Sequence, residues 1–73
     1  MRYAQLARMR FIDFLLHHYA SVGRAELEDF FAISPVSATR DFALYSKLHP
    51  GNALLNSTSK RWVRSDTFKR AYP

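Results

Sequence analysis

The chain has 73 residues, with 11 Lys and Arg against 6 Asp and Glu, so its formal net charge is +5. Its hydrophobic content of 48% is too high for a disordered tail, and the absence of cysteine excludes disulfides, cysteine-ligated zinc and thiol catalysis. No apolar run is long enough to cross a bilayer, and the N-terminus lacks a signal-peptide pattern. We expect one soluble, cytoplasmic domain over residues 1–73, whose positive charge favours an acidic partner, with nucleic acid first.

The first predicted element is a helix over residues 3–21, which contains no helix breaker. Its apolar arc covers about two thirds of the circumference and leaves a narrow polar strip that consists of Arg10, Asp13, His17 and Ser21. A helix this apolar must contact more than one neighbour. We therefore predict that four of its side chains make a symmetric contact with a second copy of the chain: Phe11, Phe14, Leu15 and His18. The alternative is that the N-terminal residues cover Phe14.

A short second helix is predicted over residues 25–31, followed by a tight turn at residues 32–33. Ser34 and Pro35 form a strong start for a third helix, because Ser can cap free amides and Pro is favoured at the first helical position. This helix is predicted over Pro35–Leu48, where residues 49–52 stop it. Ala38 is small, as two closely crossing helices require, so the pair is a helix-turn-helix candidate.

A polar turn over residues 56–60 joins two predicted strands, residues 53–55 and Arg61–Arg64. The remaining residues form a tail that begins at Ser65, with one possible helical turn through Phe68. A hairpin directly after the third helix makes the unit a winged helix. The predicted fold class is therefore mainly α: a winged helix-turn-helix of three helices plus a β-hairpin wing.

The first turns of the third helix carry the predicted DNA contacts, because these turns enter the major groove in this motif. We expect them to expose Pro35, Val36, Ser37, Thr39 and Arg40. Ser and Thr can bond bases or phosphates, and Arg can bind guanine with two hydrogen bonds. The amides that follow Ser34 could also receive a phosphate.

Basic residues are also concentrated in the hairpin and the tail, whereas acidic residues gather on the second helix. The hairpin and tail cations are Lys60, Arg61, Arg64, Lys69 and Arg70. This separation of charge is typical of a surface that docks on phosphates.

From Arg10 to Lys69 the chain resembles the N-terminal winged helix-turn-helix domain of WYL-domain transcriptional regulators, in particular the repressors beside bacterial anti-phage systems of the BREX and CBASS types. The resemblance is carried by Arg10-Phe11-Ile12-Asp13, Arg24-Ala25-Glu26-Leu27, Phe31-Ala32-Ile33-Ser34, Ala38-Thr39-Arg40-Asp41-Phe42, Tyr45, Pro50-Gly51-Asn52, Lys60-Arg61-Trp62-Val63 and Phe68-Lys69. It does not extend to a WYL domain, so ligand sensing is not carried over.

The resemblance implies a bacterial or phage-encoded, nucleoid-associated homodimer that recognises an inverted repeat in double-stranded DNA and represses a promoter. By position it puts Ser37, Thr39 and Arg40 on the recognition surface. It puts Arg24 at the start of the second helix, where backbone contact is expected, and Lys60 and Arg61 in the wing.

Two other functions stay open: a protein-interaction adaptor that pairs with a larger regulator through the first helix, and an RNA-binding winged helix. The negative charge of Asp41 repels phosphate, so Asp41 is not expected to contact DNA. It is expected to position the third helix against the first or the second. Trp62 is expected to cover the core more than to stack on bases.

An enzyme is the least expected class, because no Ser has a base at motif spacing. We expect no metal, because His17 and His18 diverge on a helix and His49 lies in a distant turn. No cofactor, small-molecule ligand or membrane partner is predicted.

Overall fold

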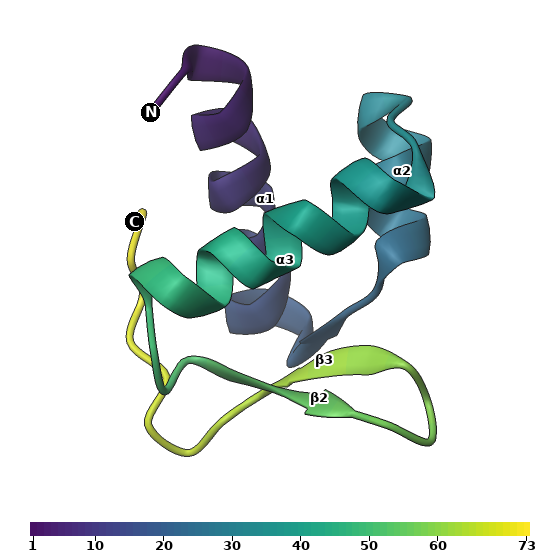
Figure 1. The fold of residues 1–73 in the computed structure, drawn as a ribbon. Coiled ribbons are helices and arrows are strands. Elements are labelled where there is room, and N and C mark those ends of the chain that lie inside the picture. Colours follow the sequence, from purple (N-terminus) through teal and green to yellow (C-terminus); the bar gives the residue numbers. More distant parts are fainter.

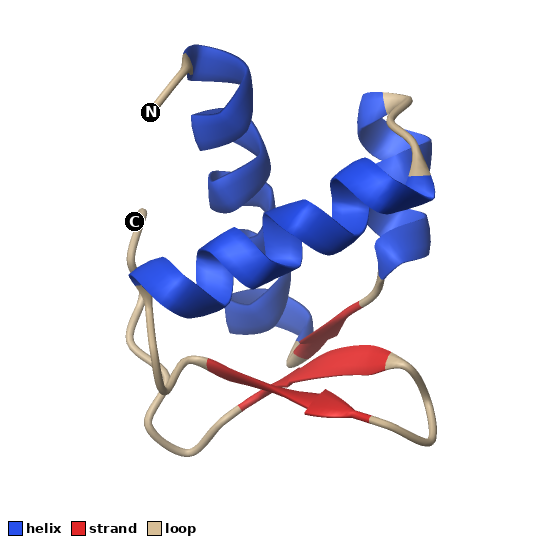
Figure 2. Ribbon diagram, in the orientation of Figure 1, coloured by secondary structure: helices blue, strands red, loops and turns tan.

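Three helices and a small antiparallel sheet make up the structure, a computed structural model that describes all of residues 1–73 (Figures 1 and 2). In chain order the elements are α1 (Tyr3–Tyr19), β1 (Ser21–Val22), α2 (Arg24–Phe31), α3 (Pro35–Leu48), β2 (Ala53–Asn56) and β3 (Arg61–Arg64). In Figure 1, α3 crosses in front of α1 and the sheet lies below the helices. The predicted winged helix-turn-helix is confirmed.

The first helix ends two residues earlier than predicted. Ala20 adopts a left-handed conformation, with φ of 65°, and its N–H donates to the Leu16 carbonyl at 3.1 Å. Ser21 and Val22 then pair with Val63 and Trp62 as a third strand, so β3 is the centre of the order β1-β3-β2. The prediction that the helix continues through Ser21 was wrong, because Ser21 and the buried Val22 pair with β3 instead.

The caps of α2 and α3 arise from local sequence. Ser34 precedes α3 and its Oγ accepts from the Ser37 N–H at 3.1 Å, while Pro35 occupies the first helical turn. The cap predicted for Ser34 is confirmed. At the start of α2, the Glu26 carboxylate reaches back and accepts from the Gly23 N–H at 3.0 Å.

The hydrophobic core lies where the three helices meet β1. It consists of Met9, Ile12, Leu16, Val22, Leu27, Ala38, Phe42 and Tyr45, each at most 3% exposed. Trp62 packs on this core and stacks on Phe42, with ring centroids 5.7 Å apart. The prediction that Trp62 covers the core is confirmed. Asp41 pairs with Arg8 of α1 at 2.6 Å, which confirms that it ties α3 to a neighbouring helix.

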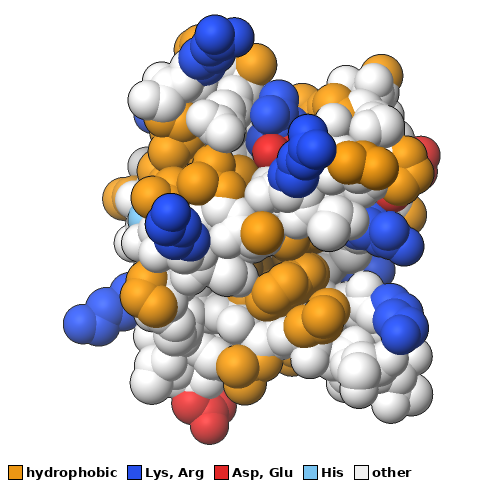
Figure 3. Space-filling view, viewed as in Figure 1, with side chains coloured by type: hydrophobic (Ala, Val, Ile, Leu, Met, Phe, Trp, Pro, Cys, Tyr) orange, Lys and Arg blue, Asp and Glu red, His pale blue; other side chains and the backbone are white.

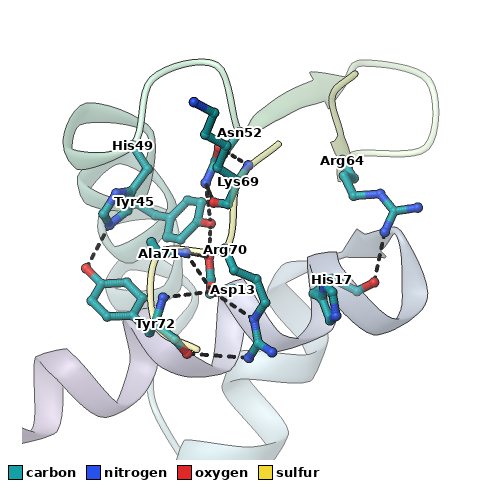
Figure 4. Close-up of polar contacts among 10 residues, drawn as sticks. All are labelled: Asp13, His17, Tyr45, His49, Asn52, Arg64, Lys69, Arg70, Ala71 and Tyr72. Atoms are coloured by element: carbon teal, nitrogen blue, oxygen red, sulfur yellow. Dashed lines mark hydrogen bonds and ion pairs between the residues drawn. The ribbon is translucent and has the colours of Figure 1, made fainter. Parts of the chain in front are cut away.

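The C-terminal tail folds back onto the body, and we call its anchor the tail clasp: Asp13, Tyr45 and Asn52 with residues 69–72 (Figure 4). Asp13 is fully buried and accepts from the Tyr45 hydroxyl at 2.6 Å and from the backbone N–H groups of Ala71 and Tyr72 at 3.1 Å. The prediction that Asp13 belongs to a polar strip was wrong, because the tail covers it.

Asn52 completes the clasp from the segment after α3. Its amide donates to the Tyr45 hydroxyl at 3.1 Å and to the Lys69 carbonyl at 2.8 Å, and its carbonyl accepts from the Lys69 N–H at 3.0 Å. Burial, together with the neighbouring Asp13 carboxylate, raises the pKa of Tyr45 well above its ordinary value, so this hydroxyl stays a donor. The clasp fixes the C-terminal end of α3 and leaves its N-terminal half outside.

Candidate nucleic-acid interface

The N-terminal half of α3 presents one largely exposed face. Positions 38, 41, 42 and 45 face the core, so the opposite side of the helix carries the exposed Val36, Thr39 and Arg40. Pro35 and Ser34 are also exposed, and Val36 is 60% exposed. This face crosses the front of the molecule in Figure 1 without an element in front of it.

Ser37 differs from its neighbours because it is half-buried. Its Oγ accepts from the Ser34 hydroxyl at 3.1 Å, so the two serines form a closed pair at the start of the helix. The Ala38 N–H is bonded to the Ser34 carbonyl. In the first turn this leaves the N–H of Val36 as a free backbone donor for an anion.

The wing consists of β2, β3 and the loop over residues 57–60, and its loop is held by Asn56. The Asn56 side-chain carbonyl accepts from the N–H groups of Thr58 and Ser59 at 2.9 and 3.1 Å. Lys60 follows in a left-handed conformation, with φ of 61°, and its N–H donates to the Asn56 carbonyl at 2.8 Å. The Lys60 side chain is exposed and has no intramolecular partner, so it is available to a phosphate.

The two predicted wing arginines are both engaged within the chain. Arg61 pairs with Glu26 of α2 at 2.5 Å and donates from Nε to Ser21 at 3.3 Å. Burial of Glu26 opposes its ionisation, but the hydrogen bonds from Arg61 and from the Gly23 amide prevail and lower the pKa of Glu26. Arg64 donates to the His17 carbonyl near the end of α1 at 2.8 Å (Figure 4).

Arg24 lies between α3 and the wing. It is exposed at the first position of α2 and lines a shallow depression of about 310 Å³ beside Pro35, Val36, Thr39 and Arg40. It also lines a groove of about 330 Å³ with Thr39 of α3 and Lys60 of the wing. The structure thus brings Arg24, Thr39, Arg40 and Lys60 to one side of the molecule, whereas Arg64 contacts α1.

The tail cations lie elsewhere. Arg70 is 3.5 Å from the buried Asp13 carboxylate, and the neighbouring backbone of Lys69 is held by Asn52 (Figure 4). The clasp therefore fixes this basic segment at the end of α3 opposite Ser34.

The four residues predicted for a dimer contact differ in exposure. Phe14 is 43% exposed and His18 is exposed, with their rings 4.3 Å apart, so the alternative in which N-terminal residues cover Phe14 is wrong. Phe11 is half-buried and stacks on Phe30 at 4.6 Å, and Leu15 packs on the core. Phe11, Phe14 and Phe30 line a shallow, mostly apolar pocket of about 320 Å³, to which Arg70 and Tyr72 of the tail also contribute.

Sequence reasoning missed Leu55, which lines the groove between α3 and the wing, and Glu26, which holds Arg61. The sequence held a signal for Leu55. Alternate residues of a strand face opposite sides, so one of the two successive leucines in this four-residue strand must face the helices or the groove beside them.

No helix here combines the length and hydropathy that a membrane span requires.

Comparison with known proteins agrees with this geometry. Residues 4–72 match the family model described as the BrxR transcriptional regulator winged helix-turn-helix domain. The chain is 32% identical over 72 residues to the DNA-binding transcriptional repressor CapW of Pseudomonas aeruginosa, and 34% identical over 71 residues to CapW of Escherichia coli strain KTE188. A third CapW repressor, from Stenotrophomonas maltophilia, is 30% identical over 69 residues.

These alignments cover 99%, 97% and 94% of this chain but only 24%, 24% and 23% of the relatives. The chain therefore spans about a quarter of the length of the curated relatives that it matches. The resemblance drawn from the sequence is confirmed by the family match, which extends from the start of α1 into the tail clasp. The chain belongs to the family of BrxR transcriptional regulator winged helix-turn-helix domains.

Proposed function

We propose that this chain binds double-stranded DNA sequence-specifically and acts as a transcriptional repressor. The observation that carries the proposal is the outward face of α3, where Thr39 and Arg40 are exposed on turns that Ala38 and Phe42 hold against the core. Further support comes from the relatives, whose printed names describe DNA-binding transcriptional repressors.

In this proposal α3 lies in the major groove. Arg40 contacts a base edge, and Thr39 and Ser37 contact bases or the adjacent backbone. Arg24 and Lys60 contact phosphates beside α3, at the groove that both residues line. Arg61 and Arg64 keep their bonds to Glu26 and to the His17 carbonyl, and these bonds hold the wing in place against the helices. The two arginines therefore position the wing on the DNA and are not its main phosphate contacts.

The chain is proposed to bind as a homodimer, so that two copies of α3 read the halves of an inverted repeat. The contact would be made by Phe14 and His18, which are exposed, with Phe11 and Leu15 beneath them. Sedimentation of the wild type and of Phe14→Ser tests this, with Tyr3→Ser as the control because Tyr3 is an 84% exposed aromatic at the other end of α1. A wild type that remains monomeric with and without DNA would contradict the dimer.

Selection of bound sites from random duplexes is the direct test of function. We expect enrichment of an inverted repeat, and loss of that enrichment in Arg40→Ala. Lys47→Ala is the matched control, since Lys47 is an exposed cation in the last turn of the same helix. An unenriched pool, or equal effects of the two variants, would contradict sequence-specific recognition by the N-terminal half of α3.

A second candidate function rests on the exposed aromatic surface of α1 and α2, where Phe14 is 43% and Phe30 is 69% exposed. Such a surface suits an adaptor that pairs with a larger regulator. A salt-insensitive protein complex that Phe30→Ser abolishes, without any duplex binding, would favour this function over the first.

A further inference from the structure

The groove between α3 and the wing has an apolar floor, which binding to phosphates by charge alone would not require. Phe42, Trp62 and Leu55 line it, and the nearly parallel rings of Phe42 and Trp62 have an interplanar angle of 12°. In Figure 3, hydrophobic side chains lie exposed in the middle of this face, between α3 and the sheet, and Lys and Arg side chains lie along its right-hand edge.

The wing presents its two leucines differently. Leu55 is paired with Trp62 across the β2–β3 ladder and lines the groove, whereas Leu54 is paired with Val63 and does not. Leu55 is 54% exposed and Leu54 is 67% exposed, so both leave apolar area in water. Only one of the pair belongs to the surface beside the recognition helix.

The charges around the groove restrict what it can hold. Two cations line it, Arg24 from α2 and Lys60 from the wing, and no carboxylate does. A ligand that matches an apolar floor with cations along one edge has apolar faces next to anionic groups. The backbone of a nucleic acid has this pattern, because the carbon faces of its sugars alternate with phosphates.

We propose that this groove binds one sugar–phosphate strand of the duplex, with deoxyribose packed on Leu55 and Trp62 and with the flanking phosphates on Arg24 and Lys60. This inference rests on the proposed function and adds to it a contact that is independent of sequence. The sugar contact neutralises no phosphate, so it contributes affinity without contributing to the dependence on salt.

The experiment compares Leu55→Ser with its neighbour Leu54→Ser, measuring affinity for a selected duplex and for an unrelated duplex over a range of salt. Burial of half a leucine side chain corresponds to about a five- to tenfold change in affinity. We expect Leu55→Ser to weaken both duplexes by that factor with an unchanged salt slope, and Leu54→Ser to leave both affinities near wild type. Lys60→Gln should instead reduce the salt slope by about 1.

Each contrary result has a distinct meaning. If Leu55→Ser matches Leu54→Ser while the wild type binds the selected duplex, the sugar contact is absent and the proposed function stands. If Leu55→Ser loses only sites that carry one particular base, the groove contacts a base, such as a thymine methyl group, and the backbone assignment is overturned. A wild type that binds no duplex overturns the proposed function and this subsite together.

Trp62 provides a second readout that does not depend on affinity. It is the only tryptophan of the chain and is half-buried in the free protein, so acrylamide quenching reports on access to the groove. Saturating duplex should protect Trp62, whereas inorganic polyphosphate, which has phosphates without sugars, should not. Quenching that is unchanged by duplex, or equal protection by polyphosphate, would overturn the proposal.

Discussion

Individual cations near the wing differ in what they can offer to DNA. Lys60 has a free ammonium group, whereas Arg61 and Arg64 already donate to Glu26 and to the His17 carbonyl. An engaged arginine must keep or exchange its partner when DNA arrives, so its net contribution to binding is smaller than its charge implies. We therefore assign the phosphate contacts first to Lys60 and Arg24, and base recognition to Arg40.

This division predicts that Arg40→Ala and Lys60→Gln affect binding differently. Arg40→Ala should cost about 1–3 kcal/mol at a selected site and little on unrelated duplex, because a base contact carries discrimination. Lys60→Gln should weaken both duplexes alike, because phosphates are common to all sequences. Titrations of the two duplexes at one salt concentration measure both effects. Equal losses from both variants on both duplexes would show that the roles are not divided in this way.

Glu26 predicts a pH dependence of stability. Its pKa in the folded chain lies below the ordinary value of 4.5, so the stabilisation from the Arg61 pair is present above pH 4.5 and is lost as pH falls through the lower folded value. Because both side chains are partly exposed, the pair is worth about 0.5–1 kcal/mol. Urea unfolding of wild type and Glu26→Gln should differ by this amount at pH 7 and converge as the pH falls below the folded pKa of Glu26. A constant difference would assign the effect to packing instead.

At the scale of elements, local signals set α2 and α3 while distant contacts set the ends of the others. Ser34-Pro35 and the stop after Leu48 are short-range features, and α3 has the predicted bounds. The end of α1 was not predictable in the same way, because Val22 fits a helical stripe but is taken into the sheet by Trp62. Leu55 was missed for a related reason: the groove is lined by residues of α2, α3 and the wing, which only the folded chain brings together.

The left-handed backbone conformation of Ala20, which follows the last residue of α1, indicates a substitution that should stabilise the fold. Ala20 has a φ of 65°, a conformation that costs a residue with a Cβ about 1–2 kcal/mol. Ala20→Gly should therefore stabilise the fold, by up to about 1 kcal/mol after the entropy of the unfolded glycine is counted. Ala7→Gly within α1 is the control and should destabilise by about 1 kcal/mol. Thermal unfolding of the two variants should shift in opposite directions; a shift in the same direction would exclude the left-handed cap as the cause.

At the scale of the whole molecule, the tail clasp makes the last residues part of the fold. Asp13 looks like a surface residue in the sequence because its partners are distant: the Tyr45 hydroxyl lies 32 residues away, and the Ala71 and Tyr72 amides lie 58 and 59 residues away. No local pattern contains such partners. The clasp holds the end of α3 opposite the exposed Thr39 and Arg40, so it supports α3 without covering the outer face of that helix.

Removal of residues 69–73 should therefore destabilise the domain far more than the loss of five terminal residues ordinarily does. The truncation removes Arg70 and the backbone N–H groups of Ala71 and Tyr72 from the Asp13 carboxylate, and a net hydrogen bond to a charged group contributes about 1.5–3 kcal/mol. Asp13→Asn in the full chain also loses part of the network. The truncation and Asp13→Asn together should lower the free energy of unfolding by less than the sum of their separate effects, because both remove the same interactions. Chemical unfolding of the four chains gives this coupling directly, and strict additivity would mean that the tail stabilises the fold by a route other than Asp13.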